Sequence, residues 1–307
     1  MIYITAYASP DLDGYSCAFA YSELLNKLGK QVEGIIFGEP DIETKFVLNK
    51  FKISQLKKTP ENIENDNFIL VDASQIIGLS EKIKPDNVIE IIDHRKFNES
   101  EKFINAKIQI ELIGAAATLV AEKFYENKIN PTFESAILLY SAIVSNTINF
   151  KNKVTTERDI KMAAYLQQFF VISKNYVHEM FVNKSKLNVS LKEFFLSNLA
   201  KIEMCGKMVS ILQLEIVEVD TFVIEHFEEI ILLLNEIKEK TKVDYLFLTL
   251  VDIEKGFNIF ICVDENTKKL IENSLKITFK NNLAKREGII MRKEIIPKVK
   301  DQLTEVN

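Results

Sequence analysis

The sequence lacks the features of secreted, disulfide-bonded and membrane-spanning proteins. Its 307 residues include only three cysteines, Cys17, Cys205 and Cys262, whose spacing fits neither a disulfide framework nor a zinc site. The apolar run at residues 222–234 is too short for a transmembrane helix and contains glutamates and a histidine. No charged leader precedes the first apolar run, so we expect no signal peptide. We therefore expect a cytoplasmic protein with buried thiols and no membrane partner.

Positive charge is also scarce. Lysine and arginine number 39 against 44 acidic residues, the net charge is −5, and no basic block stands out. This pattern does not favour nucleic acid as the main partner. Hydrophobic residues make up 47% of the chain and charged residues 27%, as in soluble globular proteins, and the length is sufficient for two domains with separate cores.

In the first half of the chain, apolar strand-like runs alternate with segments that have helical spacing. Strands are expected at residues 2–7, 31–38, 68–72, 87–92 and 107–111. Helices are expected at residues 15–25, 41–51, 113–125 and 131–144, and another should begin with Thr155 or Thr156 as its N-cap. This alternation predicts an α/β domain built on a doubly wound parallel sheet.

After about Lys186 the pattern changes. Helical segments are expected as far as Ala200, followed by strands at 207–218, 243–251 and 257–263 and helices at 221–240 and 267–275. These segments predict a smaller C-terminal α+β domain. Lysine, serine and asparagine cluster between Lys184 and Leu191, so we place the domains at residues 1–186 and 191–307.

Acidic side chains follow three of the predicted parallel strands. Asp11 and Asp13 follow the first strand, Asp72 ends the third, and Asp93 and His94 end the fourth. In an open α/β sheet, the carboxyl ends of the strands form the edge where ligands bind. Carboxylates and one imidazole suit a divalent ion such as Mn²⁺ or Mg²⁺, so this edge is a candidate metal site.

Purely structural roles for these residues remain open. Pro10 and Gly14 could form a turn, with Asp13 as the cap of the following helix. Asp93 could accept a hydrogen bond from the second ring nitrogen of His94 and fix its tautomer without touching an ion. His94 itself could be a partly buried structural histidine.

Basic residues that suit a phosphate group occur in the second half of the chain. Arg292 and Lys293 are adjacent, and an arginine fork next to a lysine point charge fits a phosphate oxyanion. Lys201 is a weaker candidate, and a solvated charged loop is the alternative for the Arg292 segment. Because the acidic and basic groups lie in different halves, we predict an active-site cleft between the two domains.

Taken together, these residues resemble the motifs of the DHH phosphoesterase superfamily, and most closely those of manganese-dependent (family II) inorganic pyrophosphatases and their exopolyphosphatase relatives. The resemblance covers nearly the whole chain and rests on the shared order and spacing of the motifs. The matching segments are Pro10-Asp11-Leu12-Asp13, Val71-Asp72, Asp93-His94, residues 113–118, Ser145-Asn146-Thr147, Phe150-Lys151, residues 155–159, Leu199-Ala200-Lys201 and residues 291–297.

The resemblance implies a DHH-type catalytic domain at residues 1–186 and a DHHA2-type phosphate-binding domain at 191–307. The implied activity is the hydrolysis of a phosphoanhydride in a small substrate such as pyrophosphate or short polyphosphate, with Mn²⁺, Mg²⁺ or Co²⁺ as cofactor and one or two ions bound. We also expect a homodimer. Asp11 would bind the first ion, Asp13 and His94 the second, and Asp72 both. The implied catalytic residues are Asp72, His94, Arg95 and Asn146, and the implied substrate-binding residues are Lys201, Arg292, Lys293 and Arg95.

The sequence departs from the family pattern at three places near the ions. Tyr7 stands where a histidine ligand is expected, Asn146 where an aspartate is expected, and Arg95 where the second histidine of Asp-His-His is expected. An Asp-His-Arg variant also occurs in the prune-like exopolyphosphatases. A neutral phenol is a poor ligand for Mn²⁺, so we expect the second ion to be held more tightly than the first. Two alternatives to a pyrophosphatase remain: a phosphoesterase whose substrate has changed, for instance to a nucleotide, and a non-catalytic phosphate-binding protein.

Overall fold

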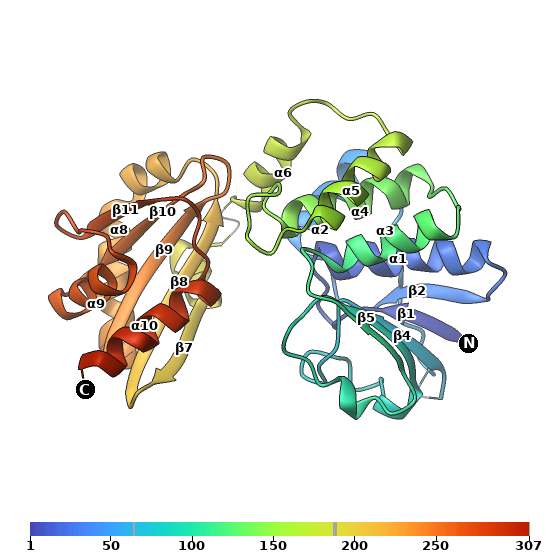
Figure 1. The fold of residues 1–307 in the computed structure, drawn as a ribbon, viewed down its shortest axis with the longest axis horizontal. Helices are drawn as coiled ribbons and strands as arrows, with labels where there is room; N and C mark the ends of the chain where they lie inside the picture. Colours follow the sequence, from blue (N-terminus) through green and yellow to red (C-terminus); the bar gives the residue numbers. More distant parts are fainter. Residues whose placement is uncertain (64, 187–188, 307) are drawn as a thin grey trace. The chain divides into compact units, whose positions relative to one another are not determined.

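The computed structural model describes residues 1–63, 65–186 and 189–306, and the chain divides into two compact units. The first unit is Met1–Asn183 and the second is Lys184–Asn307 (Figure 1). Each unit has its own sheet and its own buried core, so each is described by itself. Within the described residues, no helix is both long enough and apolar enough to cross a membrane.

The first unit contains a six-stranded sheet in which every neighbouring pair of strands is parallel. The strands run in the order β3-β2-β1-β4-β5-β6 across the sheet. Their bounds are β1 Ile2–Thr5, β2 Val32–Ile36, β3 Lys57–Lys58, β4 Asn67–Val71, β5 Val88–Asp93 and β6 Lys107–Ile110.

The order of the strands reverses at the centre of this sheet. From β1 the chain builds outward through β2 to β3, and it then returns to place β4 on the other side of β1. The crevice at the carboxyl ends of two such strands is where open α/β sheets bind ligands. Asp11 and Asp13 follow β1 and Asp72 follows β4, so the topology brings these carboxylates to the switch point of the sheet.

Figure 1 shows the α-helices of this unit gathered over one face of the sheet. Helix α1 contacts β1, β2 and β4, and α3 contacts β5. Helix α4 is almost entirely buried because it packs against α1, α3 and α5. The bounds are α1 Leu12–Lys27, α2 Ile42–Phe51, α3 Ala116–Glu126, α4 Phe133–Asn146, α5 Glu157–Leu166 and α6 Tyr176–Lys184, with short 3₁₀ helices at Pro85–Asn87, Ser100–Lys102 and Gln167–Phe169.

The opposite face of the sheet is covered by connecting segments. Ile63, Ile83 and Phe103 come from these segments and are buried against strand residues such as Phe68 and Ile91. Burying one apolar side chain of this size contributes roughly 1.5–3 kcal/mol relative to exposure, so these segments stabilise the face of the sheet that the helices leave uncovered.

A capping box begins helix α5. The Thr156 hydroxyl accepts a hydrogen bond from the Asp159 amide, and the Asp159 carboxylate accepts one from the Thr156 amide. The prediction of an N-cap at Thr155 or Thr156 is therefore confirmed for Thr156. The Asp159 carboxylate also accepts hydrogen bonds from the Gly114 amide at 3.0 Å and the Thr118 hydroxyl at 2.5 Å. These bonds tie α5 to the start of α3.

The second unit contains a five-stranded mixed sheet in the order β11-β10-β9-β8-β7. Strands β8 and β9 are parallel and are joined by the crossover helix α8, whereas the other neighbouring pairs are antiparallel. Helices α7 and α8 cover one face, and α9 and α10 cover the other. The bounds are β7 Leu199–Met204, β8 Lys207–Ile216, β9 Tyr245–Asp252, β10 Phe257–Cys262, β11 Leu283–Glu287, α7 Leu191–Ser197, α8 Val219–Thr241, α9 Glu265–Leu275 and α10 Arg292–Val306.

The predicted class, an α/β domain followed by a smaller α+β domain, is confirmed. Several elements differ from the prediction. The helical pattern expected up to Ala200 stops at Ser197, and Leu199-Ala200-Lys201 lies in the edge strand β7. The sequence patterns did not predict strands β3 and β11, because both are short and highly charged. They also did not predict helix α10, because Pro297 interrupts its helical pattern.

Candidate functional site

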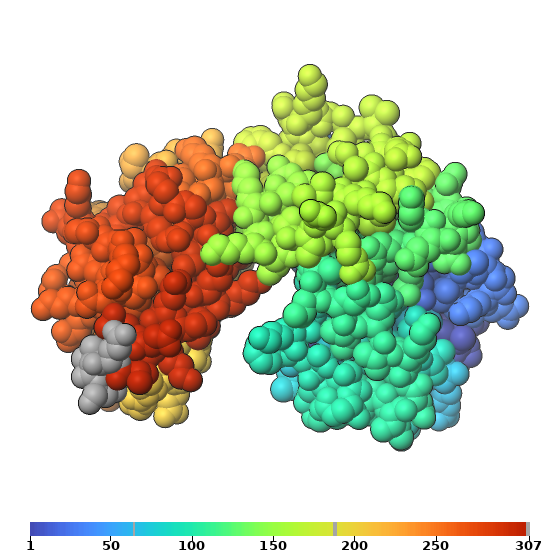
Figure 2. All heavy atoms as spheres, viewed as in Figure 1, coloured from blue at the N-terminus to red at the C-terminus, as the bar shows by residue number. Residues whose placement is uncertain are grey.

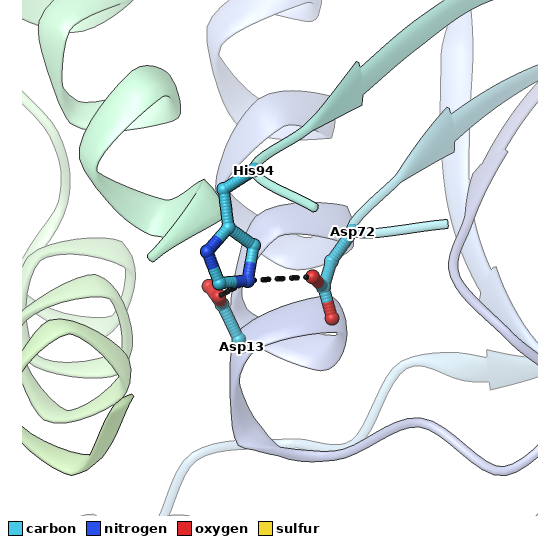
Figure 3. Close-up of side chains that lie close together, drawn as sticks. All are labelled: Asp13, Asp72 and His94. Atoms are coloured by element: carbon cyan, nitrogen blue, oxygen red, sulfur yellow. Dashed lines mark ion pairs between the residues drawn. The ribbon is translucent and has the colours of Figure 1, made fainter. Parts of the chain in front are cut away.

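Three predicted metal ligands meet at the switch point of the first sheet. Asp13 lies in the first turn of α1, Asp72 follows β4 and His94 follows β5, and Figure 3 shows their side chains pointing toward one another. Each residue offers a ligand atom, and these atoms lie within 4.8 Å of one another. His94 Nε2 is 3.4 Å from Asp72 Oδ1 and 3.7 Å from Asp13 Oδ2. Both carboxylates are buried, so the cluster concentrates negative charge in a region with little water.

The ring of His94 is oriented by a backbone carbonyl. His94 Nδ1 lies 3.1 Å from the carbonyl oxygen of Ile113. A carbonyl can only accept a hydrogen bond, so Nδ1 carries a proton and Nε2 faces the carboxylates. The hypothesis that Asp93 fixes this tautomer is wrong. Asp93 instead accepts hydrogen bonds from the amides of His94 and Arg95 and from the Ser74 hydroxyl, because its carboxylate turns back under the loop that follows β5.

Asp72 is the central carboxylate of the cluster. Its φ angle of 52° lies in the left-handed region, which residues other than glycine adopt rarely, and strain of this kind concentrates at functional sites. Its buried Oδ1 accepts no well-aligned hydrogen bond from any described residue, although His94 and Arg95 lie nearby. An oxygen in this state is suited to binding a cation.

Burial and the close contacts within the cluster raise the pKa values of its three members. Burial raises the pKa of Asp72 to about 8, with further contributions from the carboxylates of Asp11 and Asp13. Burial alone would lower the pKa of His94, but its contacts with Asp72 and Asp13 outweigh this effect and raise the pKa to about 9. Burial also raises the pKa of Asp13.

Asp13 has a structural role that sequence reasoning missed. Its Oδ2 accepts a hydrogen bond from the Ala116 amide and its Oδ1 one from the Ala117 amide, both at 2.8 Å. Ala115, the N-cap residue of α3, has no side-chain acceptor, so Asp13 caps this helix from 103 residues away. The alternative that Asp13 caps its own helix is wrong, because Asp11 is the N-cap of α1 and accepts from the Gly14 amide at 3.0 Å.

Asn146 contacts the cluster as a hydrogen-bond donor. Its Nδ2 lies 2.6 Å from Asp13 Oδ2. A carboxylate at this position would face another carboxylate unless a cation lay between them. The amide therefore satisfies Asp13 without any ion.

Arg95 also contacts the Asp72 carboxylate. Arg95 Nη1 lies 2.9 Å from Asp72 Oδ1 and Nη2 lies 3.2 Å from Oδ2, and Nη1 also contacts the backbone carbonyl of Asp72. The guanidinium lies over the ring of Tyr7, with 5.1 Å between its central carbon and the ring centroid. The Tyr7 hydroxyl oxygen accepts hydrogen bonds from the amides of Ser74 and Gln75, and burial raises its pKa. A neutral phenol in these contacts is not a metal ligand.

Comparisons with known proteins agree with this geometry. Residues 1–143 match the model of the DHH family N-terminal domain. Most of the first unit is therefore similar to the N-terminal domain of the DHH family. The chain is 29% identical over 300 residues to a Clostridium acetobutylicum protein named "Probable manganese-dependent inorganic pyrophosphatase", covering 97% of this chain and 96% of that protein. A Bacillus cereus protein of the same name is 29% identical over 301 residues, covering 96% of each chain.

A solved structure extends the likeness to the fold. The crystal structure of a candidate family II inorganic pyrophosphatase from Methanococcus jannaschii superposes with a TM-score of 0.71 at 26% identity. The match covers 99% of this chain and 100% of the other. The predicted resemblance to the DHH family and to family II pyrophosphatases is therefore confirmed.

Three of the predicted substrate-binding residues, Lys201, Arg292 and Lys293, belong to the second unit, whereas Arg95 belongs to the first. Arg292 is the first residue of α10; its amide donates to Gln213 Oε1 at 2.5 Å and its Nη1 to the Asn198 carbonyl at 3.4 Å. Lys293 is exposed beside it. Lys201 pairs with Ser210 across β7 and β8, and strand alternation places it on the α8 face of the sheet, opposite α10. The structure thus does not bring Lys201 and Arg292 to one face, and a cleft between the domains stays a prediction.

The capping role of Asp13 is tested in the absence of metal. Asp13→Ala is expected to destabilise the first unit by about 1–3 kcal/mol in EDTA, because two buried amides of α3 lose their acceptor. Asp13→Asn keeps one acceptor oxygen and should lose less. Denaturant unfolding measures both variants. Unchanged stability of Asp13→Ala in EDTA would show that this carboxylate does not hold α3.

Proposed function

We propose that the protein is a divalent-metal-dependent hydrolase that cleaves phosphoanhydride bonds in pyrophosphate or short polyphosphates. The observation that carries the proposal is the cluster of Asp13, Asp72 and His94 at the switch point of the first sheet. The relatives named manganese-dependent inorganic pyrophosphatases support this substrate class, because they align over nearly the whole chain. Two carboxylates and an imidazole suit Mn²⁺, and Mg²⁺ and Co²⁺ are the alternatives.

The described side chains fit an ion at this cluster. Asp72 offers the buried Oδ1, His94 offers Nε2 from a ring held by Ile113, and Asp13 offers Oδ2 from a carboxylate anchored to α3. When bound, a divalent ion supplies Lewis-acid stabilisation of the charge on the reacting phosphoryl oxygens. Asn146 and the α3 amides hold Asp13 in place, and Arg95 adds a fixed positive charge beside Asp72.

For the second unit, we propose a DHHA2-type phosphate-binding role for residues 191–307. Arg292 and Lys293 lie in the first turn of α10, where the helix dipole also favours anions. The Arg292 amide and side chain are held by Gln213 and Asn198, so this arginine is positioned by packing within its own unit. Lys201 belongs to the proposed set as an exposed lysine on the edge strand.

A panel of substrates and metals tests the proposed function. Phosphate release is measured with pyrophosphate, tripolyphosphate and ATP, each with Mn²⁺, Mg²⁺ and Co²⁺. Release from pyrophosphate or tripolyphosphate that depends on the ion supports the proposal. Release from ATP alone supports the alternative of a changed substrate, which the replacements Tyr7, Arg95 and Asn146 favour. Binding of pyrophosphate without turnover supports a non-catalytic phosphate-binding protein.

Metal affinity is expected to rise with pH. The pKa values of His94, about 9, and Asp72, about 8, lie above neutral pH in the ion-free cluster. An ion must displace these protons, so each pH unit between about 6 and 8 should tighten Mn²⁺ binding by up to roughly tenfold per proton released. Calorimetric titration at pH 6, 7 and 8, in two buffers that differ in ionisation enthalpy, gives both the affinity and the proton count. A pH-independent affinity would contradict the assignment of these two ligands.

A further inference from the structure

The Asp72 carboxylate is contacted by two different kinds of group. His94 Nε2 lies 3.4 Å from Asp72 Oδ1, and Asp13 belongs to the same cluster. Arg95 contacts both carboxylate oxygens, with its Nη1 2.9 Å from Oδ1 and its Nη2 3.2 Å from Oδ2. A Cβ added to Gly14 would lie 3.5 Å from Asp72 Oδ2 and 3.6 Å from Asp11 Oδ1, so the carboxylates of Asp72 and Asp11 both lie close to Gly14. Arg95 therefore contacts the carboxylate that Asp72, together with Asp11, could otherwise offer to a cation.

Several contacts hold the Arg95 guanidinium in this place. It pairs with Asp72, contacts Asp93 Oδ1 at 3.2 Å, and lies over the Tyr7 ring. The ring is fixed in turn, because the Tyr7 hydroxyl is held by the amides of Ser74 and Gln75. A planar guanidinium between an aromatic face and a carboxylate keeps its charge and a defined orientation.

Solvent reaches this arrangement from one side. Tyr7 and Arg95 line an open pocket of about 530 Å³, together with Ser9, Gln75 and Gly78. The Arg95 side chain remains 30% exposed, whereas that of Asp72 is 3% exposed. The guanidinium thus borders this open pocket and also contacts the buried Asp72 carboxylate.

We propose that Arg95, held on Tyr7, is a built-in cation that replaces a bound metal ion at the carboxylates of Asp11 and Asp72, so that the first unit binds a single divalent ion, at Asp13, Asp72 and His94. This inference rests on the proposed metal site. It differs from the two-ion arrangement that the sequence resemblance implies, because Asp11 and Asp72 do not fit an ion while Arg95 is present. The guanidinium and one divalent ion together offset most of the charge of the four carboxylates Asp11, Asp13, Asp72 and Asp93.

The number of bound ions tests the proposal in the unmodified protein. The metal-free full chain is titrated with Mn²⁺, and the free ion is counted from its electron paramagnetic resonance signal. One tight site is expected. Two tight sites would overturn the role of Arg95 while leaving the metal cluster intact. No tight site would overturn the metal cluster and, with it, the proposed function.

Removal of the arginine charge provides the second test. Arg95→Met is expected to bind an additional Mn²⁺ ion about tenfold or more tightly than the unmodified protein does, because Asp72 and Asp11 lose their counter-charge. Mn²⁺ should also raise the unfolding temperature of Arg95→Met more than that of the unmodified protein. Arg95→Lys keeps the charge and should keep one site.

A matched control separates charge replacement from packing. Arg158, in the same unit, pairs with Glu111 and Glu122 away from the cluster. Arg158→Met should leave the Mn²⁺ count and the Mn²⁺-dependent gain in unfolding temperature unchanged. If Arg95→Met loses stability that Mn²⁺ does not restore, and still binds one ion, Arg95 has only a packing role and the proposal fails.

Discussion

Asp72→Asn is expected to abolish tight Mn²⁺ binding, with a loss in affinity of at least about 100-fold, and to lower pyrophosphate hydrolysis by at least as much. The substitution keeps the volume of the side chain but removes the charge that His94 and Arg95 both face. The loss should be larger than for any other carboxylate, because Asp72 offers a buried oxygen with no well-aligned hydrogen bond from a described residue.

Calorimetric titration and phosphate release measure these two losses. Asp86→Asn is the matched control, since Asp86 is exposed on the 3₁₀ helix between β4 and β5. It should bind Mn²⁺ and release phosphate as the unmodified protein does. Near-normal Mn²⁺ affinity in Asp72→Asn would place the ion elsewhere and remove the basis of the proposed function.

Restoration of a second ion is the other large effect that we expect. The sequence alone suggests that Tyr7→His with Asn146→Asp would raise pyrophosphate hydrolysis, by supplying an imidazole and a carboxylate. The structure adds Arg95 to this set, because its guanidinium lies between Tyr7 and Asp72. The double variant should therefore gain little, whereas Tyr7→His, Arg95→His and Asn146→Asp together should bind two ions and raise turnover by roughly 10–100-fold.

The three changes should be strongly non-additive, because they share Asp72 and the same small volume. Asn146→Asp by itself places a carboxylate against Asp13, so without Mn²⁺ it should lower the unfolding temperature. Steady-state phosphate release and ion counts at saturating Mn²⁺ compare the single, double and triple variants. Two bound ions in the triple variant with no gain in turnover would favour a changed substrate or a binding protein over a weakened pyrophosphatase.

Local sequence patterns were sufficient to predict most of the elements of the first unit. Apolar runs such as residues 68–71 are typical of buried strands, and the carboxyl ends of parallel strands lie at a common edge of the sheet. The sequence alone therefore predicts that Asp13, Asp72 and His94 meet at this edge. The capping box at Thr156 could be predicted in the same way, because its two partners are three residues apart. In contrast, the charged edge strands β3 and β11 carry no apolar alternation to detect.

What the sequence determined by itself was the set of side chains at the carboxyl edge of the sheet. Only the tertiary structure decided which atoms of these side chains accept hydrogen bonds and which atoms face the other members of the cluster. The amides that hold Asp13 are 103 and 104 residues away, and the carbonyl that orients His94 is 19 residues away. In the sequence, Arg95 is identified only as a replacement for a histidine ligand. In the structure its guanidinium contacts the Asp72 carboxylate and lies over the ring of Tyr7, which follows a different strand. Directional contacts between distant segments have no local periodicity, so only the folded chain reveals them.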